Sequence, residues 1–493
     1  MGIRDAKLLL PLLTTALISA GPSKRDAPLQ YKIEGPVSVI WESVHEIQAA
    51  DSSWPGVKDA VLSPDGRCLF LAVQFGTSEE SGDGHLMGRT RSRIVSVDTS
   101  IGKTVWAETF GEADSVGDQV ISLAISFDGL RVVAFGTALT DEAGWGHEYL
   151  AEFNAKTGTT EWQVSRPGPA RGVIASHPKK NLVFVTGSRF DTARQVHEQG
   201  FVLRALDFTD GHSVWEQEFP QVAGTNLAVS SDGERLIVAG TDIGAPVLET
   251  GSSPRSDLAV CALDANTGLR QWSMRQGSGG DGKDFEPHVV LSSGSTRLFV
   301  GAQSVENKTG SGRYFIFGLD RSDGKTLWTH LYEGPTREIY SDDDLRSLTV
   351  SNDGSLVFVT GTSKGYGGSF QGFTSLEPSP VFAFRARDGR EAWRASFIGA
   401  PEQVTVNPRD GTAYVVGWRA WDSNGYINAS TVEAFEPTTG RTRWSAKCRG
   451  AGDFESLNGQ AVVCSRDGSV IYVAGGGDVK SKPAIVTVAY SLR

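Results

Sequence analysis

The chain has 493 residues, 58 of them glycine and three methionine, and its formal net charge is −11 at pH 7. This acidic balance argues against nucleic acid or an anionic membrane as a partner, because both carry negative charge themselves. Length alone would suggest about three domains. Turn signals recur along the whole chain, however, with short alternating apolar runs between them and almost no helical periodicity. That pattern favours one all-β repeat array.

Residues 1–20 have the pattern of a secretory signal peptide. Two basic residues precede an apolar run, LLLPLLTTALISA (8–20), which is too short to span a bilayer. We therefore expect a secreted, extracellular protein without a membrane span, and we interpret residues 21–35 as a linker or short pro-segment. Sequons at Asn307 and Asn428 fit glycosylated loops of a secreted protein.

The next predicted element is a lone strand over residues 37–44, which carries Trp41. Two turn signatures then alternate along the chain. The first is Asp-Gly, or a similar pair, between two β-branched runs, a strong hairpin signal because glycine accepts a positive φ. It occurs at 63–66, 126–129, 230–233, 351–354, 408–411 and 465–468, with degenerate forms at 176–181 and 292–295.

The second signature places a glycine four residues before a tryptophan. It occurs at 98–106, 154–162, 207–215, 264–272, 320–328, 385–393 and 436–444. A period of about 50–65 residues built from short strands is typical of a radial β repeat. We expect the periodic tryptophans to pack between neighbouring sheets, because aromatic residues at a fixed repeat position usually belong to a core.

The two counts differ, since there are eight first hairpins and seven second hairpins. The chain ends with a third strand over 485–490, whereas the lone strand at 37–44 has no hairpin before it. We infer that this N-terminal strand completes the last blade and protects its edge. The prediction is a single domain over 36–493, an all-β, eight-bladed β-propeller of four-stranded blades whose last blade is closed by the N-terminal strand.

In such a ring both tight turns lie on one face, and the longer, irregular loops lie on the other, which we call the loop face. Function concentrates in irregular loops on a rigid scaffold, so the loop face is the candidate binding surface. Its aromatic residues could stack on a sugar or a flat ligand, or they could pack under the loops. They are Trp145, Tyr366, Phe370, Trp418, Trp421 and Tyr426.

Acidic residues recur just before the predicted inner strands. They could ring the mouth of a central channel and attract a cation, or they could cap backbone N–H groups on a solvated surface. They include Asp118, Asp284, Asp343 and Asp453.

Two histidine–carboxylate neighbours are the candidate acid–base groups of the loop face, namely His147 beside Glu148 and His288 near Glu286. A positioned histidine or carboxylate can move a proton to or from a substrate. The sequence motifs of activated serine nucleophiles, phosphate loops and zinc sites are absent, and no metal site is predicted. We expect the four cysteines, at 68, 261, 448 and 464, to be buried thiols rather than disulfides.

The repeated D-x-x-x-G-x-x-x-W turn resembles the tryptophan-docking motif of quinoprotein-type propellers. Over residues 36–493 the chain resembles a secreted pyrroloquinoline-quinone-like repeat protein, which implies the propeller fold. Quinone-dependent alcohol dehydrogenases of this family use an adjacent-cysteine disulfide and a Glu/Asn/Asp calcium site. Adjacent cysteines are absent from this sequence and no calcium triad can be matched to it. We therefore expect no cofactor, with calcium or quinone as the less favoured alternative.

Three functions remain open, because one fold can serve many purposes. The favoured one is a binding or scaffold module that uses the loop face to bind a small molecule, a glycan or a protein. The second is a cofactor-free enzyme of small-molecule metabolism, a lyase, isomerase or cyclase with its site in the loop-face funnel. The least favoured is a quinone-dependent oxidoreductase.

Overall fold

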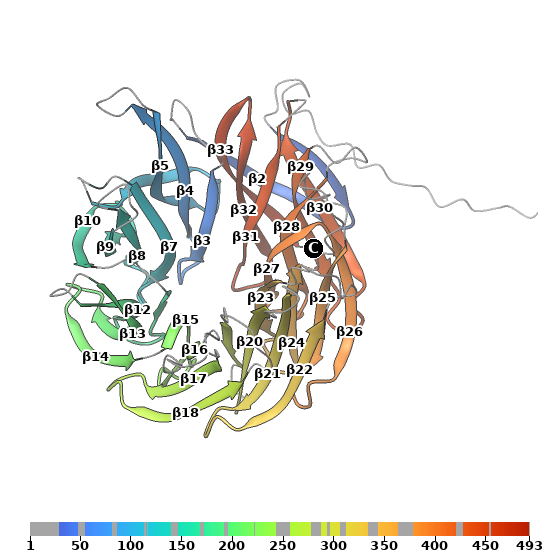
Figure 1. Cartoon of the computed structure of the whole chain (residues 1–493). Coiled ribbons are helices and arrows are strands. Elements are labelled where there is room, and N and C mark those ends of the chain that lie inside the picture. Colours follow the sequence, from blue (N-terminus) through green and yellow to red (C-terminus); the bar gives the residue numbers. More distant parts are fainter. Residues whose placement is uncertain are drawn as a thin grey trace, which may run out of the picture.

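The two repeated turns join antiparallel strands into eight sheets, and these blades are arranged as a ring (Figure 1). The predicted eight-bladed, all-β propeller is confirmed, and every element in the described part of the chain is a β-strand. The structure is a computed structural model that describes residues 29–47, 55–80, 86–112, 115, 117–139, 146–167, 172–191, 196–220, 222–242, 257–277, 287–292, 296–305, 312–333, 344–362, 378–420, 427–452 and 455–492.

Each blade runs from an inner strand at the ring axis to an outer strand at the periphery. Blade 1 contains β3 (Gly56–Leu62), β4 (Cys68–Glu80), β5 (Leu86–Asp98) and β6 (Thr104–Phe110). Blade 2 contains β7 (Gly117–Ile125), β8 (Arg131–Leu139), β9 (Gly146–Asn154) and β10 (Thr160–Pro167). Blade 3 contains β11 (Ile174–Ser176), β12 (Leu182–Asp191), β13 (Val196–Asp207) and β14 (Ser213–Pro220). Blade 4 contains β15 (Val222–Val229), β16 (Arg235–Asp242), β17 (Asp257–Asp264) and β18 (Arg270–Gly277).

The second half of the ring repeats this order. Blade 5 contains β19 (Pro287–Leu291), β20 (Arg297–Val305), β21 (Gly312–Asp320) and β22 (Thr326–Glu333). Blade 6 contains β23 (Asp344–Val350), β24 (Leu356–Thr362), β25 (Pro378–Arg385) and β26 (Glu391–Ile398). Blade 7 contains β27 (Ala400–Val406), β28 (Ala413–Ala420), β29 (Asn428–Phe435), β30 (Thr442–Gly450) and the added strand β1 (Leu29–Glu34). Blade 8 contains β31 (Leu457–Cys464), β32 (Val470–Val479), β33 (Lys482–Leu492) and the outer strand β2 (Val37–Glu46).

The Asp-Gly turns form because their own side chains satisfy the backbone of the turn. In the first of them the Ser63 hydroxyl donates to Asp65 Oδ1 at 2.6 Å and accepts from the backbone N–H of Cys68 at 2.9 Å. Gly66 has a φ of 74°, a left-handed conformation that glycine adopts without strain. The same Ser–Asp hydrogen bond recurs in the turns at 126–128, 230–232, 351–353 and 465–467.

The repeated tryptophans lie on outer strands and dock on the next blade around the ring. Trp106 of β6 donates its indole N–H to the Ala155 carbonyl of blade 2 at 3.0 Å. A Cβ at Gly158 would overlap the Trp106 ring, so this glycine allows the turn of blade 2 to approach the indole. The predicted packing between sheets is therefore confirmed. The same indole–carbonyl bond is made by Trp162, Trp215, Trp272, Trp328 and Trp393.

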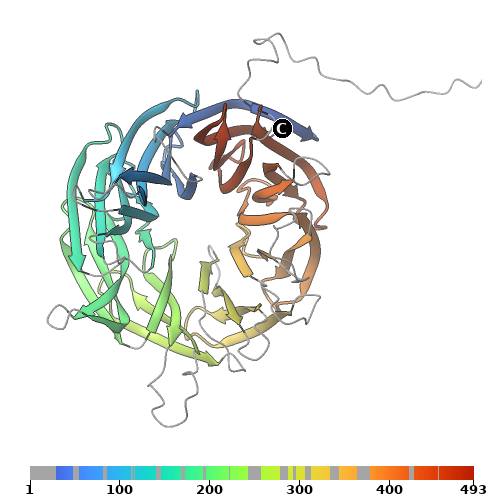
Figure 2. The ribbon, with the colours of Figure 1, turned by 45° about the horizontal axis from the view of Figure 1, so that its top comes forward.

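The ring closes through the N-terminal strand, as the turn counts predict. Strand β2 pairs antiparallel with β33, with Val37 opposite Leu492. Trp41 of β2 then docks on blade 1, where its indole N–H donates to the Thr99 carbonyl at 2.7 Å. Figure 2 shows the blue N-terminal strands beside the red C-terminal strands, so the two ends of the fold meet in one blade.

Strand β1 differs from the sequence-based interpretation, because it lies within the segment 21–35 that was assigned to a linker or pro-segment. It pairs with β30 and so becomes a fifth strand of blade 7. Its apolar residues Leu29, Tyr31 and Ile33 alternate with polar ones, and this period of two is the signal that indicates a strand. The extra strand covers Cys448 of β30, whose exposed fraction is 1%.

The hydrophobic core lies between neighbouring blades rather than at one centre. Between blades 5 and 6, for example, Phe299 and Trp328 pack against Phe382. All four cysteines, at positions 68, 261, 448 and 464, are free thiols as predicted. The expected burial holds for Cys448, whereas the other three are half-buried. None of the described residues belongs to a helix long and apolar enough to cross a membrane.

Candidate functional site

On the loop face, the strands of different blades extend to different distances from the ring. Strands β4 and β5 of blade 1 have 13 residues each, whereas β24 of blade 6 has 7. The β4–β5 hairpin accordingly extends from the ring (Figure 1). Many of the predicted site residues lie outside the described residues, namely Trp145, Asp284, Glu286, Asn307, Asp343, Tyr366, Phe370, Trp421, Tyr426 and Asp453.

The structure separates the sequence neighbours His147 and Glu148, because successive side chains of a strand point to opposite faces. Both belong to β9 of blade 2. The ring nitrogen Nδ1 of His147 is 3.4 Å from both carboxylate oxygens of Glu112, which follows the outer strand of blade 1. Glu148 points towards blade 3, where it accepts a hydrogen bond from Arg204 at 2.5 Å. The two side chains therefore contact different partners on different sides of blade 2.

Glu148 belongs to a chain of charges between blades 2 and 3. Arg204 Nε also donates to Glu216 Oε2 at 3.2 Å, and Arg166 lies 3.6 Å from the same oxygen. The side chains of Glu148 and Arg204 are 2% and 6% exposed. Burial raises the pKa of Glu148, and the positive charges of Arg204 and Arg166 oppose that rise. A buried pair of this kind is held because losing either partner leaves an uncompensated charge.

Asp118, predicted to lie at the mouth of the channel, is also almost fully buried, with an exposed fraction of 1%. Its carboxylate accepts hydrogen bonds from the Ser115 hydroxyl at 2.5 Å and from Arg91 Nη1 at 3.3 Å. Burial raises its pKa, while these two bonds lower it. Asp118 thus connects β5 of blade 1 to the start of β7 in blade 2.

His288 lies on the inner strand β19 of blade 5. Burial, together with the positive charge of Arg346 on β23, lowers the pKa of His288 to about 4. The imidazole is therefore neutral near pH 7, a state that can accept a proton. Its neighbour Glu286 is not among the described residues, so the structure leaves this second pair untested.

Two further predicted residues lie at the loop-face end of blade 7. Trp418 is half-buried near the end of β28. Asn428 is the half-buried first residue of β29, and its backbone N–H donates to the Ser456 hydroxyl at 3.0 Å. Next to Trp418, Arg419 donates to Glu433 of β29 at 2.5 Å. This end of the blade is also held by polar bonds.

A set of polar side chains around the ring axis was not singled out from the sequence. Asp59, Asn226, Ser347 and Gln403 each occupy the same place on an inner strand, four residues before the serine or asparagine of the Asp-Gly turn. Each accepts the backbone N–H of the next blade's inner strand, at Leu123, Val289, Val404 and Val462, over distances of 2.8, 3.3, 3.1 and 2.7 Å. A polar residue recurring at this repeat position is the signal that could have identified them.

The polar side chains described above hold neighbouring blades together and do not gather into one cluster of reactive groups among the described residues. Within the part of the chain that the structure describes, no group of three or more His, Cys, Asp and Glu side chains could hold a metal ion. The described polar residues near the loop face, such as Glu148, Asp118 and Arg204, are bonded across blade boundaries. The result is a rigid ring that carries hairpins of unequal length.

A family model described as outer membrane protein assembly factor BamB matches residues 39–226 and 146–416, which together make up more than half of the chain. No curated protein matches the chain.

Solved structures with the same fold share very little sequence with this chain. Sqt1 from Saccharomyces cerevisiae is 11% identical, with a TM-score of 0.54 over 91% of this chain and 99% of that one. The Dos1 propeller is 10% identical, with a TM-score of 0.52 over 92% and 95%. The quinohemoprotein alcohol dehydrogenase from Comamonas testosteroni is 12% identical, with a TM-score of 0.52 over 92% and 76%. These likenesses show the propeller fold alone.

Proposed function

The chain belongs to the family of PQQ-like β-propeller repeat proteins described as outer membrane protein assembly factor BamB, and from this membership we propose that it is a secreted binding or scaffold module that engages its partner through the loop face. The proposal assigns the ring a supporting role and the hairpins and loops a recognition role. Propellers of this kind offer a broad, rigid surface on which loops of variable length can contact a partner.

The observation that carries the proposal is the set of contacts that the candidate acid–base groups make. Glu148 is buried in an ion pair with Arg204, at 2.5 Å, so it is not available to a substrate. Asp118, one of the acidic residues expected at the channel mouth, is likewise bonded to Ser115 and Arg91. Charged groups that hold neighbouring blades together favour a binding platform over a catalytic funnel.

The unequal hairpins support recognition of a large partner. Strands β4 and β5 extend the loop face of blade 1, and β12 and β13 of blade 3 have 10 and 12 residues. A ligand resting on such a surface meets projections on several blades. A protein or a glycan chain fits this shape better than a small metabolite.

The test is site-specific photo-crosslinking of the protein, produced in its own host, with the secreted proteins and glycans of that host. One probe replaces Thr90 of β5 near the loop face, and a matched probe replaces the exposed Asp65 of the tight turn in the same blade. We expect a discrete adduct from position 90 and none from position 65. Shortening the hairpin between β4 and β5 should abolish the adduct.

Two results would contradict the proposal. An adduct formed only from position 65 would place the binding surface on the tight-turn face. A small organic molecule found bound in native mass spectrometry, and converted to product on incubation, would favour the cofactor-free enzyme instead. The variant His147→Ala separates these cases, since a binding module should keep its adduct and an acid–base enzyme should lose turnover.

A further inference from the structure

Glu152 occupies a position that is small in every other blade. It lies on β9 opposite Trp162, the docking tryptophan of blade 2. Because a tryptophan on the neighbouring strand covers this position, the other seven blades place alanine, glycine or serine there. These residues are Ser96, Ala205, Ala262, Gly318, Ala383, Ala434 and Ala489.

The Glu152 side chain is fully buried, with an exposed fraction of 0%. Within the described part of the chain, neither of its carboxylate oxygens accepts a hydrogen bond. Arg131 Nε lies 4.0 Å from Oε1, which is beyond hydrogen-bond distance. A buried carboxylate in this situation costs free energy when it is charged, because nothing replaces the water it has lost.

The contrast with Glu148 on the same strand is informative. Glu148 and Glu152 are four residues apart and face the same side of β9, towards blade 3. Glu148 receives a hydrogen bond from Arg204. Arg131, the cation nearest to Glu152, is shared with Asp128, from which it is separated by 3.8 Å. Glu152 is therefore the buried glutamate of this interface that lacks a hydrogen-bonded cation among the described residues.

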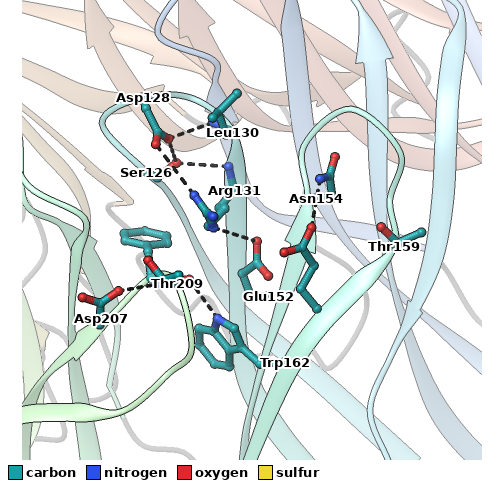
Figure 3. A network of polar contacts seen from close by, with 12 residues as sticks. Ser126, Asp128, Leu130, Arg131, Glu152, Asn154, Thr159, Trp162, Asp207 and Thr209 are labelled. Atoms are coloured by element: carbon teal, nitrogen blue, oxygen red, sulfur yellow. Dashed lines mark hydrogen bonds and ion pairs between the residues drawn. The ribbon is translucent and has the colours of Figure 1, made fainter.

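Glu152 lies where blades 2 and 3 are joined. Figure 3 shows it between Arg131 and Trp162, whose indole N–H donates to the carbonyl of Phe208 in blade 3 at 2.8 Å. A Cβ at Gly211 in the same turn would come within 2.8 Å of the Trp162 ring, so the contact is tight. The inner strand of blade 3 is only 3 residues long, and Trp162 packs against the apolar cluster between the two blades.

We propose that protonation of Glu152 is a switch for the joint between blades 2 and 3. In the protonated state the neutral carboxyl group lies under Trp162 without a charge to solvate. In the ionised state the charge attracts water or Arg131, and Trp162 separates from the turn at Phe208. Acidification tightens the joint, and a rise above neutral pH loosens it.

The direction of the pH effect follows from the burial. Burial raises the pKa of Glu152 from its ordinary value of 4.5 to about 7, the negative charge of Glu161 adds to the rise, and Arg131 opposes it. Between these two pH values the folded chain holds a proton that the unfolded chain has released. The contribution of Glu152 protonation to the stability of the fold is complete below the pKa of the unfolded chain, and it is lost as the pH rises through 7.

Other charged groups face the same joint and must be distinguished. Asp128 of the β7–β8 turn is hydrogen-bonded to Asn181 of blade 3. Asp207 belongs to the turn of blade 3 on which Trp162 docks, and its carboxylate accepts a hydrogen bond from the backbone N–H of Thr209. His212 of that turn is paired with Asp210, which raises its pKa. It is exposed, and His212→Asn removes its contribution.

The experiment is equilibrium denaturation of the full chain at pH 5, 6, 7 and 8, with the variants Glu152→Gln, Glu152→Ala and His212→Asn. Glutamine keeps the shape of the protonated acid, and alanine is the residue of most other blades. The quantity compared is the ratio of the unfolding equilibrium constant of the wild type to that of Glu152→Gln. We expect this ratio to rise by roughly ten- to a hundredfold between pH 5 and pH 8. The pH dependence of His212→Asn should still include this rise.

Hydrogen exchange locates the effect. The backbone N–H of Phe208 donates to the Asn181 carbonyl at 2.9 Å. After correction for intrinsic exchange, this amide should be less protected from exchange at pH 8 than at pH 5. The difference should occur in the wild type and be absent from the Glu152 variants. The equivalent amide of Ala265, which bonds the Glu234 carbonyl at 3.0 Å in blade 4, is the internal control. Equal pH profiles for the wild type, Glu152→Gln and Glu152→Ala would overturn the proposal. So would a loss of protection that is the same at both amides.

Discussion

Gly187 shows how a single residue positions the buried charges between blades 2 and 3. A Cβ at this glycine would overlap the Glu148 carboxylate and approach the Arg204 guanidinium. Both groups are buried and hydrogen-bonded to each other at 2.5 Å. Neither can move aside without breaking the ion pair, so the sequence must keep the smallest residue here.

The variant Gly187→Ala should therefore lower the free energy of unfolding by about 2 kcal/mol, the usual cost of forcing extra volume into a packed interior. Chemical denaturation of both proteins would measure it. Gly277→Ala is the matched control, because its new Cβ would lie 3.5 Å from Asp257, an ordinary contact distance. If the two variants were equally stable, the Glu148–Arg204 pair would be less rigidly held than its geometry indicates.

At the scale of elements, the two N-terminal strands have different tasks. Strand β2 supplies the outer strand of blade 8 and carries Trp41 to its docking position on blade 1. Strand β1 covers the edge of blade 7 and the Cys448 thiol. They are joined at Gly35, which lies against Trp444. One short segment therefore connects the two blades on either side of the last interface.

Removal of the two strands should have separate effects. Deletion up to residue 34 should expose Cys448, whose thiol pKa is raised by burial in the intact protein, and leave the ring folded. Iodoacetamide at pH 8, read by mass spectrometry, should then label Cys448 in the shortened protein and spare it in the full chain. Deletion up to residue 46 should in addition lower the free energy of unfolding by about 3 kcal/mol or more, because Trp41 and a whole strand are lost. If the second deletion were as stable as the first, β2 would not close the ring.

At the scale of the whole molecule, stability depends on a closed ring rather than on the order of the chain. Neighbouring blades are joined by apolar clusters and by docked tryptophans such as Trp106. At several interfaces they are also joined by side-chain bonds near the axis. Gln460 of blade 8 accepts the backbone N–H of Val57 in blade 1 at 2.6 Å, so these axial bonds also cross the point of closure. Breaking the chain at one connection should matter less than breaking the ring.

A circular permutant tests this view. Since Val37 lies opposite Leu492, a short turn can join residue 492 to residue 37, and the chain can begin at residue 55 and end at residue 47. We expect this permutant to have the same near-ultraviolet circular dichroism as the protein that lacks residues 1–36, and a Tm within about 5 °C of it. A permutant that fails to fold, alongside a stable truncated protein, would show that the original connectivity is needed.

The sequence by itself determined the number of blades and the way in which the ring closes. The Asp-Gly and Gly–Trp turns are local signals, because their φ angles and hydrogen bonds involve residues only a few positions apart. Counting eight of one and seven of the other was therefore enough to assign the N-terminal strand to the last blade. The alternating apolar residues of β1 were an equally local signal, but their partner, β30, is more than 400 positions away.

Only the tertiary structure decided which polar residues serve the architecture. Glu148 follows His147 in the sequence, yet its partner Arg204 lies in another blade. Glu152 is an ordinary polar residue of an amphipathic strand until its side chain is seen to be buried under Trp162. Burial, charge pairing and the resulting pKa depend on residues brought together by the ring from distant repeats. The local pattern therefore predicts the frame of this protein, whereas the state of its charged groups is set by contacts between blades.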